Sequence, residues 1–179
     1  MHDTKVKLDS EVERHTLTVL VDNEAGVLAR VVGLFSGRGY NIESLTVAEV
    51  DPMARTSRIT IVTSGTLHVI EQIEAQLRRL VPTHKVTNWT DNRGGAKAGI
   101  EREMALIKVA GTGEKRVEAL RMADAFRARP VDTTHSSFVF EITGAPAKID
   151  SFVDLMRPLG LVDVSRTGVA AISRGPEAM

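Results

Sequence analysis

The order of two hydrophobic periodicities along the chain restricts its possible folds more than any other feature. In the first 90 residues, short β-branched or alternating runs predict strands at residues 15–21, 42–50, 58–63 and 85–89. Apolar residues spaced by three and four positions predict helices at residues 27–35 and 67–80. The first half of the chain is therefore expected to follow the order β-α-β-β-α-β.

A polar, glycine-rich stretch, DNRGGAKAG, separates this half from a second half with the same order. In the second half, strands are expected at residues 102–110, 130–134, 137–143 and 161–165, and helices at residues 114–127 and 147–159. Two such blocks predict an α+β chain of two ferredoxin-like βαββαβ domains. The expected organisation is an N-terminal extension (1–14), a first domain (15–91), a linker (92–100) and a second domain (101–179).

Three local expectations concern the second domain. In the helix at residues 114–127, Val117, Leu120 and Ala123 are expected to face the core. Glu101 and Glu103 are expected on a solvated strand start. The GTG run at residues 111–113 matches neither phosphate-binding glycine pattern in full, so a plain strand-to-helix turn is favoured there.

Composition and charge exclude several classes of protein. The 179 residues include no cysteine, which excludes disulfides and thiolate metal sites. The 23 basic residues balance 23 acidic ones and only 4% of residues are aromatic, which argues against nucleic-acid binding. The N-terminus has no apolar signal region, and no run approaches the roughly 20 apolar residues of a membrane span. We therefore expect a cytoplasmic protein.

Residues suited to catalysis are scarce. The histidines form no metal-binding pair and accompany no nucleophile with a carboxylate partner; they are His2, His15, His68, His84 and His135. The sequence thus predicts a protein that is not itself an enzyme and holds no metal.

One corner of the first domain has a pattern that suits a small ligand. The run NEAGVLAR begins directly after a predicted strand, so the N–H groups of Gly26, Val27 and Leu28 are expected in the first turn of a helix, without an acceptor within it. The positive end of the helix dipole favours a carboxylate there, and the Asn23 side chain can accept a hydrogen bond from an ammonium group. Val27, Leu28 and Ile42 offer apolar contacts. From these residues by themselves, an amino-acid pocket and a simple helix-capping turn remain equally open.

Longer motifs relate the chain to a family. The run LTVLVDNEAGVLARVVGLFSGRGYNIESLTVAEV, and GLFSGRGYNIESLTV in particular, resembles the N-terminal ACT domain of the acetolactate synthase (acetohydroxyacid synthase) small regulatory subunit. The resemblance continues through EQIEAQLRRLV and IEREMALIKV to VSRTGVAAISRG, and so covers residues 15–174.

This resemblance implies a regulatory role. Such a subunit activates a large catalytic subunit that carries thiamine diphosphate, magnesium and FAD, and it confers feedback inhibition by valine in branched-chain amino acid biosynthesis. It needs no cofactor of its own and forms a homodimer with valine at the interface of two ACT domains. The matching positions for valine are Asn23, Gly26, Val27, Leu28, Ala29, Asn41 and Ile42, with the last two reaching across from the partner chain, and Thr46 is a weaker candidate.

One position departs from the family pattern, and two other functions compete with the regulatory role. Ala29 stands where some relatives carry serine, which removes a hydroxyl donor near the expected pocket. The main alternative is a stand-alone ACT-domain amino-acid sensor that acts on another partner, such as a transcriptional regulator. A regulator of that kind requires a helix-turn-helix, for which the chain has no room. An independent enzyme would require a paired nucleophile and base, and the sequence shows none.

Overall fold

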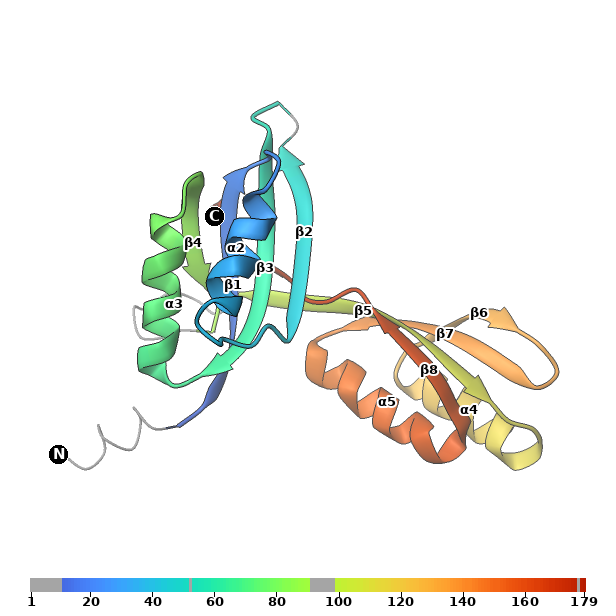
Figure 1. Ribbon diagram of the computed structural model, residues 1–179. Coiled ribbons are helices and arrows are strands. Elements are labelled where there is room, and N and C mark those ends of the chain that lie inside the picture. The colour runs from blue at the N-terminus through green and yellow to red at the C-terminus, as the bar shows by residue number, and fades with distance from the viewer. Residues whose placement is uncertain (1–10, 52, 91–98, 177) are drawn as a thin grey trace. The chain divides into compact units, whose positions relative to one another are not determined.

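The computed structural model describes residues 11–51, 53–90, 99–176 and 178–179 (Figure 1). Most of the expected N-terminal extension and linker, and His2, lie outside these ranges. The chain divides into two compact units, one made of residues 1–100 and 169–179 and the other of residues 101–168. Each unit has a hydrophobic core of its own.

The first unit has the predicted order of elements. They are β1 (Glu13–Asp22), α2 (Val27–Ser36), β2 (Ser44–Asp51), β3 (Thr56–Gly65), α3 (Leu67–Arg79) and β4 (Thr83–Asn88). The strands pair antiparallel in the spatial order β2-β3-β1-β4. This order is that of a ferredoxin-like sheet, so the predicted fold of this unit is confirmed.

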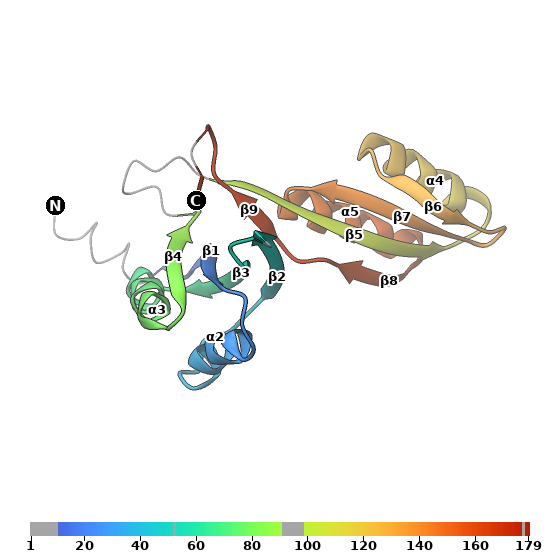
Figure 2. The ribbon, with the colours of Figure 1, turned by 90° about the horizontal axis from the view of Figure 1, so that it is seen from above.

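Both helices of the first unit cover the same face of its sheet (Figures 1 and 2). Alternate residues of the two central strands, such as Leu17 on β1 and Ile61 on β3, point into this layer and are fully buried. They meet the apolar stripe of each helix, for which Phe35 on α2 and Ile73 on α3 are examples. The period-2 and period-3.6 patterns of the sequence therefore meet in one core.

The opposite face of this sheet is also covered, which the sequence pattern did not predict. Thr18 and Thr60 are buried there although they point away from the helices. The indole N–H of Trp89 donates to Thr18 Oγ1 at 2.7 Å, and Thr18 Oγ1 lies 3.4 Å from Thr60 Oγ1. Hydrogen bonding among these groups satisfies polar atoms that burial removes from water.

A C-terminal segment contributes to this second layer. The short strand β9 (Ala170–Ile172) was not predicted, and Val169 and Ala171 beside and within it are buried. Thr46 Oγ1 donates to the carbonyl of Val169 at 2.6 Å, and the Val169 N–H donates to Ser44 Oγ at 3.2 Å. The expected second domain, residues 101–179, therefore differs from the observed one, because residues 169–179 group with the first unit.

The second unit repeats the same fold. Its elements are β5 (Ile100–Ala110), α4 (Gly113–Ala125), β6 (Arg129–Thr133), β7 (Ser137–Gly144), α5 (Pro146–Gly160) and β8 (Leu161–Arg166). The strands lie in the order β6-β7-β5-β8, again antiparallel. The expected plain turn at residues 111–113 is observed as the link from β5 to α4.

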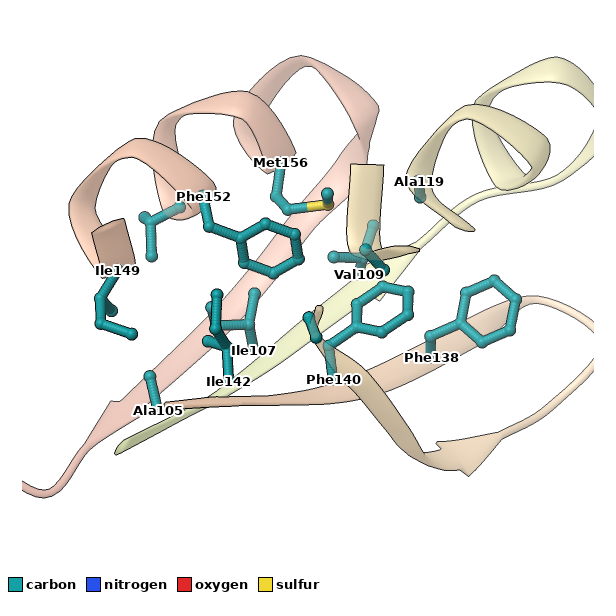
Figure 3. Packing of buried hydrophobic residues seen from close by; sticks show 13 residues of the cluster. Ala105, Ile107, Val109, Ala119, Phe138, Phe140, Ile142, Ile149, Phe152 and Met156 are labelled. Atoms are coloured by element: carbon teal, nitrogen blue, oxygen red, sulfur yellow. The ribbon is translucent and has the colours of Figure 1, made fainter. Parts of the chain in front are cut away.

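The core of the second unit is centred on aromatic side chains (Figure 3). Phe140 of β7 and Phe152 of α5 are fully buried and meet edge to face, with ring centroids 6.1 Å apart. The predicted inner face of α4 is wrong in two of three positions, because Val117 and Leu120 are 50% and 40% exposed. Ala123 is buried as expected, and Ala119, which was not predicted, is also buried in the core.

Three charged residues form two linked ion pairs at the start of the second unit. Glu103, expected on a solvated strand, is 5% exposed and accepts two hydrogen bonds from Arg166, at 2.7 and 2.6 Å. Arg166 also donates to Asp150 at 2.6 Å. The hydrogen bond with Glu103 raises the pKa of Arg166 above its ordinary value, against the opposing effect of burial. The group therefore joins β5, β8 and α5 and has a structural role.

Candidate functional site

The corner between β1 and α2 has the geometry that the sequence predicted. Strand β1 ends at Asp22 and helix α2 begins at Val27. Gly26 precedes the helix with φ of 85°, a left-handed conformation that costs other residues free energy. No atom lies within 4 Å of where a Cβ on Gly26 would be, so the space beside this backbone is open to a ligand.

The N–H groups of this corner are partly free. The Val27 N–H donates to the Glu24 carbonyl at 3.4 Å. Within the described part of the chain, the N–H groups of Gly26 and Leu28 make no hydrogen bond. The first turn of α2 contains no acidic residue, so its positive dipole end is not neutralised from within the helix. Two unpaired N–H donors at a helix N-terminus can donate hydrogen bonds to a carboxylate.

The side chain of Asn23 is oriented by a residue that the sequence analysis did not single out. Asn23 Nδ2 donates to Oε1 of Glu49, which lies near the end of β2, at 3.0 Å. The Asn23 N–H donates to the Arg55 carbonyl at 2.6 Å. The amide oxygen of Asn23 is then the atom left to accept from a ligand. Glu49 adds a negative charge beside it, and together these groups suit an ammonium. Glu49 lies 26 residues beyond Asn23, so no local motif could reveal this contact.

The apolar residues of the corner divide between core and surface. Val27 is 8% exposed and packs in the first core, so it can offer a ligand its N–H group but little side-chain surface. Leu28 is 39% exposed and Ala29 is exposed. The structure therefore gathers Asn23, Gly26, Leu28 and Ala29 around one open corner.

Asn41 and Ile42 lie elsewhere in the same chain. They precede β2, where the Asn41 carbonyl accepts from Thr63 Oγ1 at 2.6 Å and Ile42 packs against the first core. Asn41 lies three residues before β2 begins, and the five strand steps from Ser44 to Glu49 span about 17 Å. A single chain thus does not bring Asn41 and Ile42 to the Asn23 corner. Thr46 lies between the two ends, and its hydroxyl is bonded to Val169.

Each of the four described histidines is either exposed or in contact with a polar neighbour. His84 Nε2 lies 2.5 Å from Asp22 Oδ1 on the surface, and buried His15 contacts Asn88. His68 contacts Gln72, and His135 is exposed. Within the described ranges, no three His, Asp or Glu side chains come together as a metal site, and no helix is long and apolar enough to cross a membrane.

Comparison with protein-family models covers both units. Residues 17–85 match the AHAS small subunit-like ACT domain. Residues 102–175 match the model described as the small subunit of acetolactate synthase. The first match contains the Asn23 corner, and the second contains all of the second unit from residue 102 onward.

Individual relatives match nearly end to end. The chain is 46% identical to a probable acetolactate synthase small subunit of Archaeoglobus fulgidus, over 90% of this chain and 98% of that one. It is 43% identical to the acetolactate synthase isozyme 3 small subunit of Escherichia coli, over 93% and 99%. The crystal structure of the acetolactate synthase small subunit from Thermotoga maritima superposes with a TM-score of 0.78 at 36% identity, over 92% of this chain and 99% of that one. The protein therefore belongs to the acetolactate synthase small-subunit family.

Proposed function

We propose that this chain is the regulatory subunit that activates the thiamine-diphosphate-dependent catalytic subunit of acetolactate synthase and confers feedback inhibition by valine. Membership of a small-subunit family implies a large catalytic partner. The observation that supports the regulatory role is the open corner, where two free N–H groups of α2 lie beside the paired side chains of Asn23 and Glu49. The chain would take no part in the chemistry, and thiamine diphosphate, magnesium and FAD would belong to the catalytic subunit. We place this complex in the cytoplasm.

The corner can supply each contact that a small α-amino acid requires. The free N–H groups of Gly26 and Leu28 would hold the carboxylate at the positive end of the α2 dipole. The Asn23 amide oxygen and the Glu49 carboxylate would hold the ammonium group. Leu28, which is exposed in the single chain, would cover the aliphatic side chain. A short aliphatic side chain such as that of valine fits this arrangement.

A homodimer would complete the site. Strand β2 is an edge strand of its sheet and exposes Val47 and Val50, so its free backbone groups can pair with another strand. If β2 pairs antiparallel with its own copy, the start of one strand comes beside the end of the other. Asn41 of the partner subunit would then lie near Glu49, which explains how residues far apart in one chain could serve one ligand.

Ligand at such an interface gives a physical means of regulation. A molecule that binds one packing of the two chains more tightly shifts the population toward that packing. Coupling to the catalytic subunit must be reciprocal, so that subunit would change the valine affinity by the same factor. A coupling free energy of about 1–3 kcal/mol is typical of allosteric proteins and is enough here.

The proposal is tested by titrating valine into the purified full-length chain in a calorimeter, with and without the cognate catalytic subunit. Saturable binding is expected for the wild type, and Asn23→Ala is expected to abolish it. Gln72→Ala, which removes another exposed amide of the first unit, serves as the matched control. In parallel, the chain should raise the pyruvate-condensing activity of the catalytic subunit, and valine should reduce it. An unchanged activity would refute regulation, and valine binding without an effect on activity would favour a stand-alone amino-acid sensor.

A further inference from the structure

A groove runs between the two helices of the first unit, on the side of α2 that faces α3. Its lining residues come from both helices and the turns that follow them: Arg30, Leu34, Arg38, Gln76, Arg79 and Leu80. Its volume is about 520 Å³. The groove is distinct from the Asn23 corner, which lies at the N-terminal end of α2.

The groove carries a local excess of positive charge in a chain whose net charge is zero. Of the six described residues that line it, three are arginines and none is acidic. Arg30 is occupied, because it donates to the Val81 carbonyl at 2.5 Å and to Glu24 at 3.1 Å. Arg38 and Arg79 are exposed, and their guanidinium groups make no hydrogen bond or ion pair with any described residue. Two guanidinium groups thus remain available to an incoming acid.

Two described acidic residues near these helices, Glu74 and Glu24, are engaged by other groups. Glu74 of α3 accepts hydrogen bonds from Arg78 at 2.6 Å and from Asn88 of β4 at 2.9 Å. It therefore lies on the β4 side of α3, away from the groove. Glu24 reaches the groove only through its ion pair with Arg30. The arrangement leaves the positive charge directed outward.

The shape of the groove favours a segment of a protein over a small free ligand. Small ligands are bound where most of their surface is enclosed, but this groove is open to solvent along exposed arginines. Its floor is apolar and includes Leu34 and Leu80, which pack partly against the first core. None of the described lining residues is aromatic, so stacked bases would find no platform among them. A segment that alternates carboxylates with an aliphatic residue matches both the charge and the floor.

We infer that the α2–α3 groove is a docking site for an acidic segment of the acetolactate synthase catalytic subunit. Carboxylates of that segment would pair with Arg38 and Arg79, because guanidinium groups bind carboxylates in a two-pronged geometry. An aliphatic side chain between them would rest on Leu34 and Leu80. This inference rests on the proposed function, since it requires the catalytic subunit as the partner. It also places the docking surface and the valine corner on the same helix, α2.

The test measures binding of the full-length chain to its immobilised catalytic subunit at low and high salt. Arg38→Ala/Arg79→Ala should weaken binding about three- to twentyfold at low salt, as expected for two partly exposed ion pairs. Gln76→Glu, which keeps every arginine but adds a competing carboxylate, should weaken binding in the same direction. The control Arg78→Ala/Lys85→Ala removes the same charge from the β4 side and should bind like the wild type. High salt should reduce the difference between the variants, because it screens exposed charges.

The outcomes separate this inference from the proposed function. A wild type that neither binds nor activates the catalytic subunit would refute both. If the wild type activates the catalytic subunit, and both groove variants fold and bind like the control, only the docking site would be overturned. If Arg38→Ala/Arg79→Ala fails to fold by circular dichroism, the Gln76→Glu result decides. If the groove variants change how the small subunit sediments in the absence of the catalytic subunit, the groove forms contacts between copies of this chain. That result would overturn the inference.

Discussion

At the scale of single residues, two threonines of the first unit show how the same side chain can have opposite effects on stability. Thr18 Oγ1 accepts from the Trp89 indole and lies beside the Thr60 hydroxyl in a buried layer. Thr83 Oγ1 is also buried, but it has no hydrogen-bond partner among the described residues. A buried hydroxyl stabilises a protein only when its hydrogen bonds replace those it made to water.

We therefore predict opposite results for one substitution at these two positions. Thr18→Val keeps the shape but leaves the Trp89 N–H without its acceptor, and it should lower the free energy of unfolding by about 1–3 kcal/mol. Thr83→Val removes an unpaired polar group and should leave that free energy unchanged or raise it by up to about 1 kcal/mol. Urea unfolding followed by the fluorescence of Trp89, the single tryptophan, measures both. Equal losses at the two sites would contradict the assignment.

Residue contacts also mark where the sequence analysis of the site was incomplete. Asn23 and the glycine turn could be predicted from residues adjacent in sequence, because a helix start depends on local sequence. The Asn23–Glu49 hydrogen bond could not, since it joins residues that only the β-sheet brings together. The burial of Glu103 was missed for the same reason, because its partner Arg166 comes from β8.

At the scale of elements, two glycines in different conformations lie at the start and in the interior of helix α2. Gly26 precedes the helix at a positive φ of 85°, whereas Gly33 lies in the helix interior on the exposed side. At both positions no atom lies within 4 Å of an added Cβ. Any difference between them therefore comes from the backbone and not from packing.

We predict that Gly26→Ala and Gly33→Ala change stability in opposite directions. Gly26→Ala should lower the free energy of unfolding by about 1–2 kcal/mol, because a side chain disfavours the left-handed region. Gly33→Ala should raise it by about 0.5–1 kcal/mol, because alanine loses less backbone entropy in a helix. Thermal unfolding of the two variants and the wild type gives the comparison. A loss of stability at Gly33 would show that another chain packs closely on this side of α2.

Elements with a strong pattern were predicted well, and weakly patterned ones were not. The two βαββαβ blocks are confirmed, and most of their strands and helices show a clear period. Strand β9 was missed because three residues are too few to show a period. On α4, Val117 and Leu120 fitted a helical spacing, but the core accepted the alanine face. Helical spacing identifies a possible face, and packing against the other elements decides which face is buried.

At the scale of the whole molecule, the chain passes between its units twice, at residues 100–101 and 168–169. Just beyond these points, the Met104 N–H donates to Thr167 Oγ1 at 3.1 Å and the Thr167 N–H donates to the Met104 carbonyl at 3.0 Å. The ends of the second unit therefore lie side by side. The first core contains no residue from the second unit. The second unit is therefore inserted into the chain of the first unit and has a core of its own.

We predict that the first unit folds when residues 101–168 are replaced by a flexible linker of about six Gly and Ser residues. Its core is self-contained, and all seven proposed valine positions lie between residues 23 and 42. The shortened chain should unfold in one cooperative transition and bind valine with an affinity close to that of the full chain. Circular dichroism and calorimetry measure these properties, with the shortened Asn23→Ala variant as the control. An unfolded product would show that the second unit is needed for the stability of the first.

The sequence by itself determined the order of the elements within the two βαββαβ blocks, the repeated fold and the family resemblance that the comparisons confirmed. These properties depend on periodicity and on motifs of neighbouring residues, which require no long-range contact to recognise. Only the tertiary structure decided that residues 169–172 return to the first unit, that Glu49 supports Asn23, and that Asn41 lies at the far end of β2. It also decided that three arginines line one groove. Each of these depends on which distant segments pack together, and that choice is made by the burial and hydrogen bonding of the whole chain.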